Sequence, residues 1–105
     1  MTLLISQKAD FLVAEFQTEI TIFNVAELQQ TLATMLKSLA EHDVEKLILD
    51  VAGITDLDSA GVQLLQWVIQ HTVPPVAVMV ALGDNPTVQR MVDLYALDWP
   101  TQFDR

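Results

Sequence analysis

Two acidic side chains and a serine stand close together in the segment Asp56-Leu57-Asp58-Ser59, the stretch of the chain richest in groups that do chemistry. Two carboxylates two positions apart in a loop can share a cation, although the sequence offers no evident third ligand. A serine hydroxyl can cap a helix or accept a phosphate. The segment follows the apolar run Leu47–Val51, and sites in α/β proteins gather at the carboxyl ends of strands. We therefore expect the functional site between residues 52 and 61.

Ser59 directly precedes the helical pattern that begins at Ala60, so it stands where a helix N-cap belongs. As a cap, its hydroxyl would satisfy a free backbone N–H of the first turn. As a phosphate site, it would meet the same N–H groups and the positive end of the helix dipole. The small residues Ala60 and Gly61 leave access for a kinase, and a phosphate adds a charge of about −1.5 to −2. The residues alone leave both interpretations open.

Catalysis finds little support among the remaining polar residues. A serine hydrolase needs a Gly-x-Ser-x-Gly turn, and Ser59 is flanked by Leu57 and Gly61 instead. His71 follows on the same expected helix, roughly 18 Å away at about 1.5 Å per residue, and His42 is expected in a solvated loop. A phospho-aspartate receiver would need a late lysine, but Lys46 is the last one. We expect no enzyme, no cofactor and no metal site.

The charge balance is strongly acidic, with a net charge of −9 and 5 scattered lysines and arginines. Nucleic-acid binding needs clustered positive charge and is not expected, and an anionic membrane surface is disfavoured for the same reason. No apolar run reaches the roughly 18 residues of a membrane helix, and no signal peptide is expected. The lack of cysteine fits a cytoplasmic protein. The length suits one domain over residues 1–105, and the charge favours a basic protein partner.

Hydrophobic periodicity predicts alternating strands and helices. The expected order is strand, strand, helix, strand, helix, strand, helix, with room for a last short strand. Strands are expected at 2–6, 11–16, 47–51 and 76–82, and helices at 24–39, at 60–71 and from 84 onward. Two apolar strands separated by a helix require a right-handed crossover and a parallel pair. We predict one α/β domain with a mixed, mostly parallel sheet, antiparallel N-terminal strands and about three covering helices.

Caps and apolar stripes indicate where the helices begin and which faces they bury. Asn24 with Glu27 three residues later has the form of a capping box. Asp84 or Asn85 is expected to cap the last helix ahead of Pro86. The inner faces are expected to carry Val25, Leu28, Leu32, Met35, Leu36 and Leu39, then Val62, Leu65, Val68 and Ile69, then Val88, Met91, Val92 and Tyr95.

Three aromatic residues have two interpretations each. Trp67 either packs over the sheet edge or anchors a partner, because tryptophan is enriched at interface hot spots. Trp99 and Phe103 either pack back on the core or form an apolar patch for dimerisation or binding. For Trp67 we favour packing over the sheet edge, whereas both interpretations of Trp99 and Phe103 stay open.

The stretch Leu49–Leu65 resembles the signature loop of STAS domains, the family of the anti-sigma-factor antagonists and their relatives. Residues 20–28 and 83–88 resemble the family's approaches to its first and third helices. The resemblance implies the family fold and a protein-binding switch. It further implies that Ser59, directly after Asp58, is phosphorylated by a cognate anti-sigma kinase, which breaks the complex until a phosphatase restores it. Asp58 and Gly61 correspond to the family's aspartate and glycine.

Two departures from the family pattern bear on the pathway. Gln17-Thr18-Glu19 stands where many members have a glycine, and Ala60 replaces a second hydroxyl residue. The version with alanine resembles small STAS proteins that accompany chemotaxis or phospholipid-transport ABC systems. The resemblance thus implies a protein partner, either a serine kinase of the anti-sigma type or a signalling or transport complex. A homodimer is a further alternative.

The expected contact surface comprises the loop 53–59 and the first half of the helix that follows. Its residues are Asp56, Leu57, Asp58, Ser59, Ala60, Gly61, Val62 and Gln63. We expect a partner to bind unmodified Ser59 and to be repelled by a phosphate added beside two carboxylates. One alternative is a constitutive scaffold of a chemosensory or lipid-transport ABC complex, in which Ser59 is only a cap. Another is a small-ligand or lipid-sensing pocket near the same strand ends.

Overall fold

The computed structural model describes residues 3–39, 41 and 44–102 of the chain. Thr2, His42 and Phe103, for which the sequence suggested a strand, a loop and an apolar tail, lie outside the described residues. The elements are, in chain order, β1 (Leu3–Lys8), β2 (Phe11–Phe16), α1 (Val25–Leu39), β3 (Lys46–Asp50), α2 (Ser59–His71), β4 (Ala77–Ala81), α3 (Pro86–Leu94) and β5 (Thr101–Gln102).

The strands form one five-stranded sheet in the order β1-β2-β3-β4-β5. β1 pairs antiparallel with β2 across a tight turn at Ala9-Asp10. The pairs β2–β3, β3–β4 and β4–β5 are parallel, as expected where a helix carries the chain back between strands. The predicted mixed, mostly parallel sheet with antiparallel N-terminal strands is confirmed, and β5 is the last short strand.

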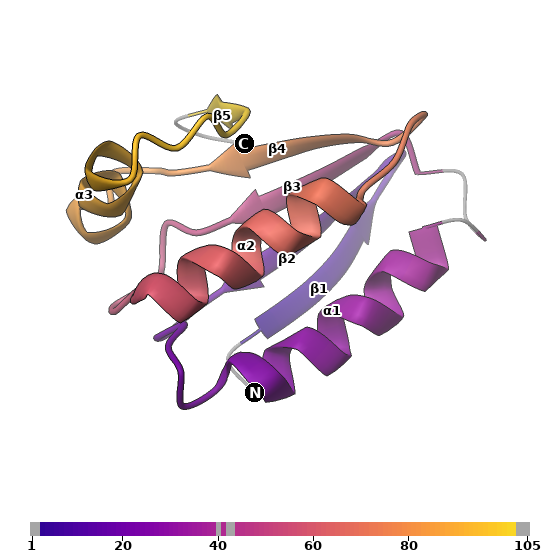
Figure 1. Ribbon diagram of the computed structural model, residues 1–105. Coiled ribbons are helices and arrows are strands. Elements are labelled where there is room, and N and C mark those ends of the chain that lie inside the picture. Colours follow the sequence, from indigo (N-terminus) through magenta and orange to yellow (C-terminus); the bar gives the residue numbers. More distant parts are fainter. Residues whose placement is uncertain (1–2, 40, 42–43, 103–105) are drawn as a thin grey trace.

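The main core lies between the sheet and two long helices. Figure 1 shows α1 and α2 across one face of the sheet, with α3 beyond the end of β4. Successive strand residues point to opposite faces, so Leu12, Ala14 and Phe16 of β2 join this core. Val13 instead joins a small cluster with Ile48 and Ala81. The expected inner residues that are buried are Leu28, Leu32, Met35 and Leu39 in α1, Val62, Leu65 and Val68 in α2, and Val88 in α3.

In the C-terminal part of the chain, one residue that was expected to be buried is exposed. Tyr95 was expected on the inner face of the last helix, but its side chain is exposed. The prediction was wrong because α3 ends at Leu94 and Tyr95 is its C-cap, so helical spacing no longer applies there. Trp99, by contrast, is buried and packs on the main core.

None of the helices in the described ranges combines the length and apolarity that crossing a bilayer requires.

Candidate functional site

The loop from Val51 to Asp58 joins the end of β3 to the start of α2 and is held by backbone hydrogen bonds. It runs beside the segment that follows β2, where Ile20 and Leu57 form a parallel bridge. The Ile20 N–H donates to the Asp56 carbonyl over 2.9 Å, and the Asp58 N–H donates to the Ile20 carbonyl over 3.4 Å. The side chains of Ile20 and Leu57 are both buried. The loop is therefore an extension of the sheet that places the next helix at a fixed position.

Asp58 is the residue that joins this loop to two other segments. It is the N-cap of α2, and its Oδ1 accepts a hydrogen bond from the Gly61 N–H over 2.9 Å. Its Oδ2 accepts from the Ile22 N–H over 2.9 Å, although Ile22 lies 36 residues earlier. Both carboxylate oxygens thus bind backbone N–H groups. Asp58 holds together the start of α2 and the loop that leads into α1.

Ser59 is the first residue of α2, and the interpretation of Ser59 as the helix cap is wrong. The cap is Asp58, whose backbone is extended, with φ −104° and ψ −176°, and whose carboxylate accepts the third N–H of the helix. The Ser59 side chain is exposed. Its hydroxyl makes no hydrogen bond to any part of the chain that the structure describes. The hydroxyl is accessible, and the fold does not use it.

Asn85 fixes the first half of the same loop from the side of α3. It caps α3, with its Oδ1 accepting from the N–H groups of Thr87 and Val88. Its Nδ2 donates to three loop carbonyls, those of Val51 and Ala52 at 3.0 Å and that of Ile54 at 2.9 Å. The residue is buried. The sequence indicated the cap but not this second role, which depends on a contact more than 30 residues away.

The eight residues expected at the contact surface separate into two groups by exposure. Asp56, Ser59 and Gln63 are exposed, and Asp58 and Ala60 are half-buried. Leu57, Gly61 and Val62 are buried. Gly61 packs against the backbone of Ile20 and the side chain of Leu57, and all three residues support the surface from beneath without reaching it. A partner that docks on this face meets the other five.

Two exposed apolar residues next to this surface were missed by the sequence interpretation. Phe23 is 90% exposed and Ile22 is 65% exposed, in the loop that Asp58 holds. Beside them lies a shallow cavity of about 390 Å³ between α1 and α2, which we call the α1–α2 groove. It is lined by Ile22, Val25, Gln29, Ala60, Gln63, Leu64 and Trp67. The sequence does contain a signal for this exposed pair, because Ile22 and Phe23 directly precede Asn24 and lie outside the apolar periodicity of the helix.

Trp67 has features of both predicted roles, packing on the core and contact with a partner. Its side chain is partly buried and packs against the main core. It also lines the α1–α2 groove. It is therefore a structural residue with one edge available to a partner.

Asn24 stands at the predicted N-terminus of α1. The predicted capping box is wrong, because the Asn24 side chain bonds to residues before the helix and not to its first turn. The Asn24 Oδ1 accepts from the Thr21 N–H over 2.9 Å, and its Nδ2 donates to the Glu19 carbonyl over 2.8 Å. The side chain thus reaches backward into the loop because the Thr21 N–H and Glu19 carbonyl need partners there. Asn24 shapes the loop that exposes Ile22 and Phe23.

The other chemistry considered from the sequence has little geometric support. Within the described ranges, no group of three or more His, Cys, Asp or Glu side chains is placed to hold a metal ion. Asp58, one of the two loop acids, already uses both oxygens on backbone N–H groups. Ser59 and His71 are the first and last residues of α2, so they lie at opposite ends of that helix.

Replacing Asp58 with asparagine should lower the free energy of unfolding by about 1 kcal/mol, because an amide nitrogen cannot accept the Ile22 N–H bond. Urea denaturation of the two proteins measures the difference. Asp56→Asn removes the same charge from an exposed position two residues away. That control should change stability by less than about 0.5 kcal/mol. Equal losses in the two variants would mean that Asp58 acts only through its charge.

The STAS domain model matches residues 3–99 of the chain. No curated protein sequence matches the chain. The fold is similar to that of an anti-sigma factor antagonist from Mycobacterium paratuberculosis, with a TM-score of 0.80 and 19% identity. That match covers 97% of this chain and 85% of the other.

Two further solved structures have the same fold. A candidate anti-sigma factor antagonist from Thermotoga maritima matches with a TM-score of 0.77 and 15% identity, over 91% of this chain and 80% of that one. The antagonist SpoIIAA in its unphosphorylated form matches with a TM-score of 0.69 and 15% identity, over 95% and 85%. At such identities the structures establish the fold alone. The family model matches nearly all described residues, and this match shows that the chain belongs to the STAS domain family.

Proposed function

We propose that this chain is a protein-binding switch, without turnover of its own, whose partner affinity is controlled by phosphorylation of Ser59. The observation that carries the proposal is that Asp58 caps α2, which leaves an exposed serine hydroxyl with no bond to the described fold. The similar structures are described as anti-sigma factor antagonists, one of them in an unphosphorylated form. A serine at this position can therefore be modified without loss of a structural contact.

The physical effect of a phosphate on Ser59 would differ between the domain and its complex. In the free domain, the positive end of the α2 dipole favours a phosphate at the first helical residue. In a complex, the same phosphate would be buried beside Asp58, close to the apolar α1–α2 groove. Removing a doubly charged group from water next to a like charge is costly. The modification thus weakens binding while the domain stays folded.

We propose that the partner is a protein and that the two meet in the cytoplasm. We place the contact on Asp56, Asp58, Ser59, Ala60 and Gln63, together with the groove and the exposed pair Ile22 and Phe23. A serine kinase of the anti-sigma type would be both the modifying enzyme and the binding partner. The second candidate is a constitutive scaffold of a chemosensory or lipid-transport ABC complex, favoured by Ala60, which offers no second hydroxyl. That scaffold would use the same surface without a phosphate.

Ser59→Asp should lower the affinity for the protein that co-purifies with the unmodified chain by about tenfold or more, because it fixes a charge in the interface. Ser59→Ala should bind like the wild type and keep that affinity after kinase treatment. Isothermal titration before and after treatment measures both. Each variant should change the unfolding free energy by less than about 0.5 kcal/mol, since Ser59 is not the cap. If both variants bind like wild type before and after treatment, the switch is refuted.

Phe23→Ser should lower the same affinity by about tenfold or more, because exposed aromatic side chains in preorganised loops act as interface anchors. Its stability should not change, since the ring is 90% exposed. Tyr95→Ser removes an exposed aromatic ring just beyond α3 and is the matched control. The same titration compares the two. If the two variants lose affinity equally, Phe23 is not part of a defined contact.

A further inference from the structure

The sheet has one long open edge, formed by β1. Figure 1 shows β1 as the outermost strand on the side of α1, and among the described strands it pairs with β2 alone. β1 pairs over six consecutive residues, without the proline or bulge that commonly protects such an edge. The opposite edge is β5, which has two residues and follows Pro100, a residue without an N–H group. β1 is therefore the edge at which another strand can be added.

Half of the backbone groups of β1 point away from the sheet. The carbonyl of Asp10, directly before β2, accepts from the Glu45 N–H over 2.7 Å and so points toward β3. Because these groups alternate in direction along a strand, those of Phe11 point toward β1, where Lys8 is its partner. The same alternation along β1 turns outward the N–H and C=O groups of Leu3, Ile5 and Gln7. These groups have the spacing that an added strand requires.

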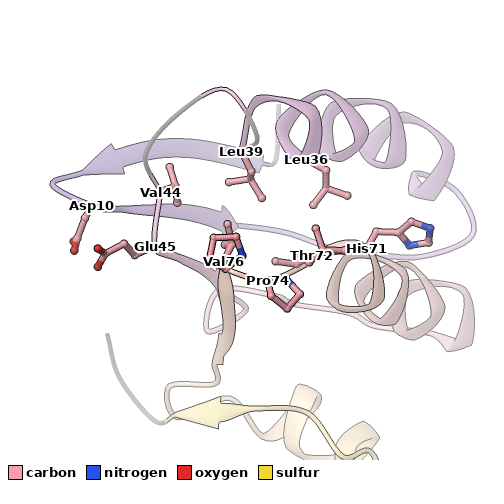
Figure 2. Close-up of a pocket in the computed structure, with 11 residues that line it drawn as sticks. Asp10, Leu36, Leu39, Val44, Glu45, His71, Thr72, Pro74 and Val76 are labelled. Atoms are coloured by element: carbon pink, nitrogen blue, oxygen red, sulfur yellow. The ribbon is translucent and has the colours of Figure 1, made fainter.

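The side chains of β1 are apolar at one end of the strand and basic at the other. Leu4 is 49% exposed and Ile5 is 39% exposed, while Lys8 is the only charged residue of the strand. The nearest acid in sequence, Asp10, lines the pocket of Figure 2, where it lies beside Glu45 on the side of the hairpin that faces β3. Two copies of this acidic chain therefore repel each other less along β1 than their net charge of −9 implies.

A second copy of β1 fits this edge in an antiparallel register with Ser6 on the two-fold axis. The small Ser6 side chains of the two copies then face each other, which permits the close approach of strands there. Ile5 faces Gln7 of the second copy, and their outward backbone groups can exchange hydrogen bonds. Leu4 faces Lys8 of the second copy, whose aliphatic stem can cover it.

The same register brings opposite charges together. Glu15 of β2 is the neighbour of Leu4 within one copy, and Lys8 of the second copy lies on the other side of Leu4. The three side chains share one face of the sheet, because directly paired residues point the same way. Two strand spacings, roughly 10 Å, then separate the backbones of Lys8 and Glu15, a gap that their two long side chains span. The two-fold axis creates two such pairs, which favours a second copy over an unrelated strand.

We propose that this chain forms a symmetric dimer in which β1 pairs with β1 of a second copy and joins the two sheets into one. No residue of β1 belongs to the Ser59 contact surface, so the dimer presents two such surfaces and suits a partner that is itself dimeric. The contact is small, and we expect a dissociation constant on the order of 100 µM. The dimer does not depend on the proposed switch.

Sedimentation equilibrium of the full-length chain at up to about 1 mM should show the mass rising from 11.7 kDa toward twice that value. Gln7→Pro removes one outward N–H from each copy and leaves the bonds to β2 in place, so it should weaken association at least about tenfold. Gln7→Thr keeps the N–H and is the matched control, which should associate like the wild type. Amide spectra establish that both variants are folded.

Exchanging the charges tests the register. Lys8→Glu and Glu15→Lys should each weaken association about fivefold or more, because each places like charges together at both sites. An equimolar mixture of the two variants should associate again, because both sites of the mixed dimer then join opposite charges. Net charge alone would instead strengthen the Glu15→Lys dimer, and a folding defect would not be repaired by mixing.

A disulfide locates the two-fold axis, since the chain has no cysteine of its own. Facing residues at the axis have Cα atoms about 4.5 Å apart, within the range of roughly 4.4 to 6.8 Å for a disulfide. Ser6→Cys should therefore cross-link under mild oxidation, and Gln7→Cys, which faces Ile5, should not. A chain that stays monomeric throughout, a Gln7→Pro variant that associates as well as Gln7→Thr, a mixture no better than its components, or equal cross-linking would each overturn the proposal.

Discussion

Replacing Gly61 with alanine should lower the free energy of unfolding by about 3 kcal/mol, although alanine is the better helix former. Gly61 lies in the first turn of α2, pressed against the segment that follows β2. A Cβ there would collide with the Ile20 carbonyl oxygen and lie 2.7 Å from the Leu57 Cδ1. The backbone oxygen cannot turn away, because it accepts the Asp58 N–H bond. Urea denaturation measures the loss.

The control for this prediction is Gln70→Ala, at an exposed position of the same helix. It should be neutral or slightly stabilising, as helix propensity alone predicts. The Gly61 variant should also shift the amide resonances of Ile20 and Ile22, because α2 must move away from their segment. If Gly61→Ala instead stabilised the protein, the close packing of α2 on the loop would be disproved.

Replacing Asn85 with aspartate should lower the free energy of unfolding by about 3 kcal/mol or more. The Asn85 amide nitrogen donates to the carbonyls of Val51, Ala52 and Ile54. A carboxylate of the same shape keeps the cap of α3 but faces those three oxygens with a negative charge and nothing to donate. Thermal or urea unfolding measures the loss, and amide exchange in residues 51–58 should increase.

Asn24→Asp is the matched control because it makes the same change in another loop. The Asn24 amide nitrogen donates to a single carbonyl, that of Glu19, and its Oδ1 bond survives the change. Its loss should be about 1 kcal/mol. Losses of equal size would contradict the role of Asn85 in organising the loop between β3 and α2.

Much of the fold was predictable because it rests on local patterns. The apolar spacing of Leu28, Leu32 and Met35 gave the buried face of α1 directly, and the continuous run Leu47–Val51 gave a central strand. The mixed sheet followed from strand order and connection length. Tyr95 was misplaced because the periodicity of a helix does not show where the helix ends.

The details of the site depended on contacts that have no local pattern. Both Asp58 and Ser59 are good caps by residue type, and only the geometry shows that Asp58 has that role. The bond from Ile22 to Asp58 spans 36 positions, and those from Asn85 to the loop span more than 30. The burial of Leu57 and Val62 follows from how α2 sits on the sheet. The exposure of Phe23 was likewise hidden, since an apolar residue in a sequence is first expected inside.

Phosphopeptide mapping of the protein purified from its own cells tests the central claim most directly. Tandem mass spectrometry of the peptide that spans residues 47–90, which lies between successive basic residues and contains Ser59, locates any phosphate within it. The account predicts a single phosphate on Ser59 in a fraction of the molecules, at a level that changes with growth conditions. An unmodified Ser59 under every condition, or a phosphate on Thr55 alone, would contradict it.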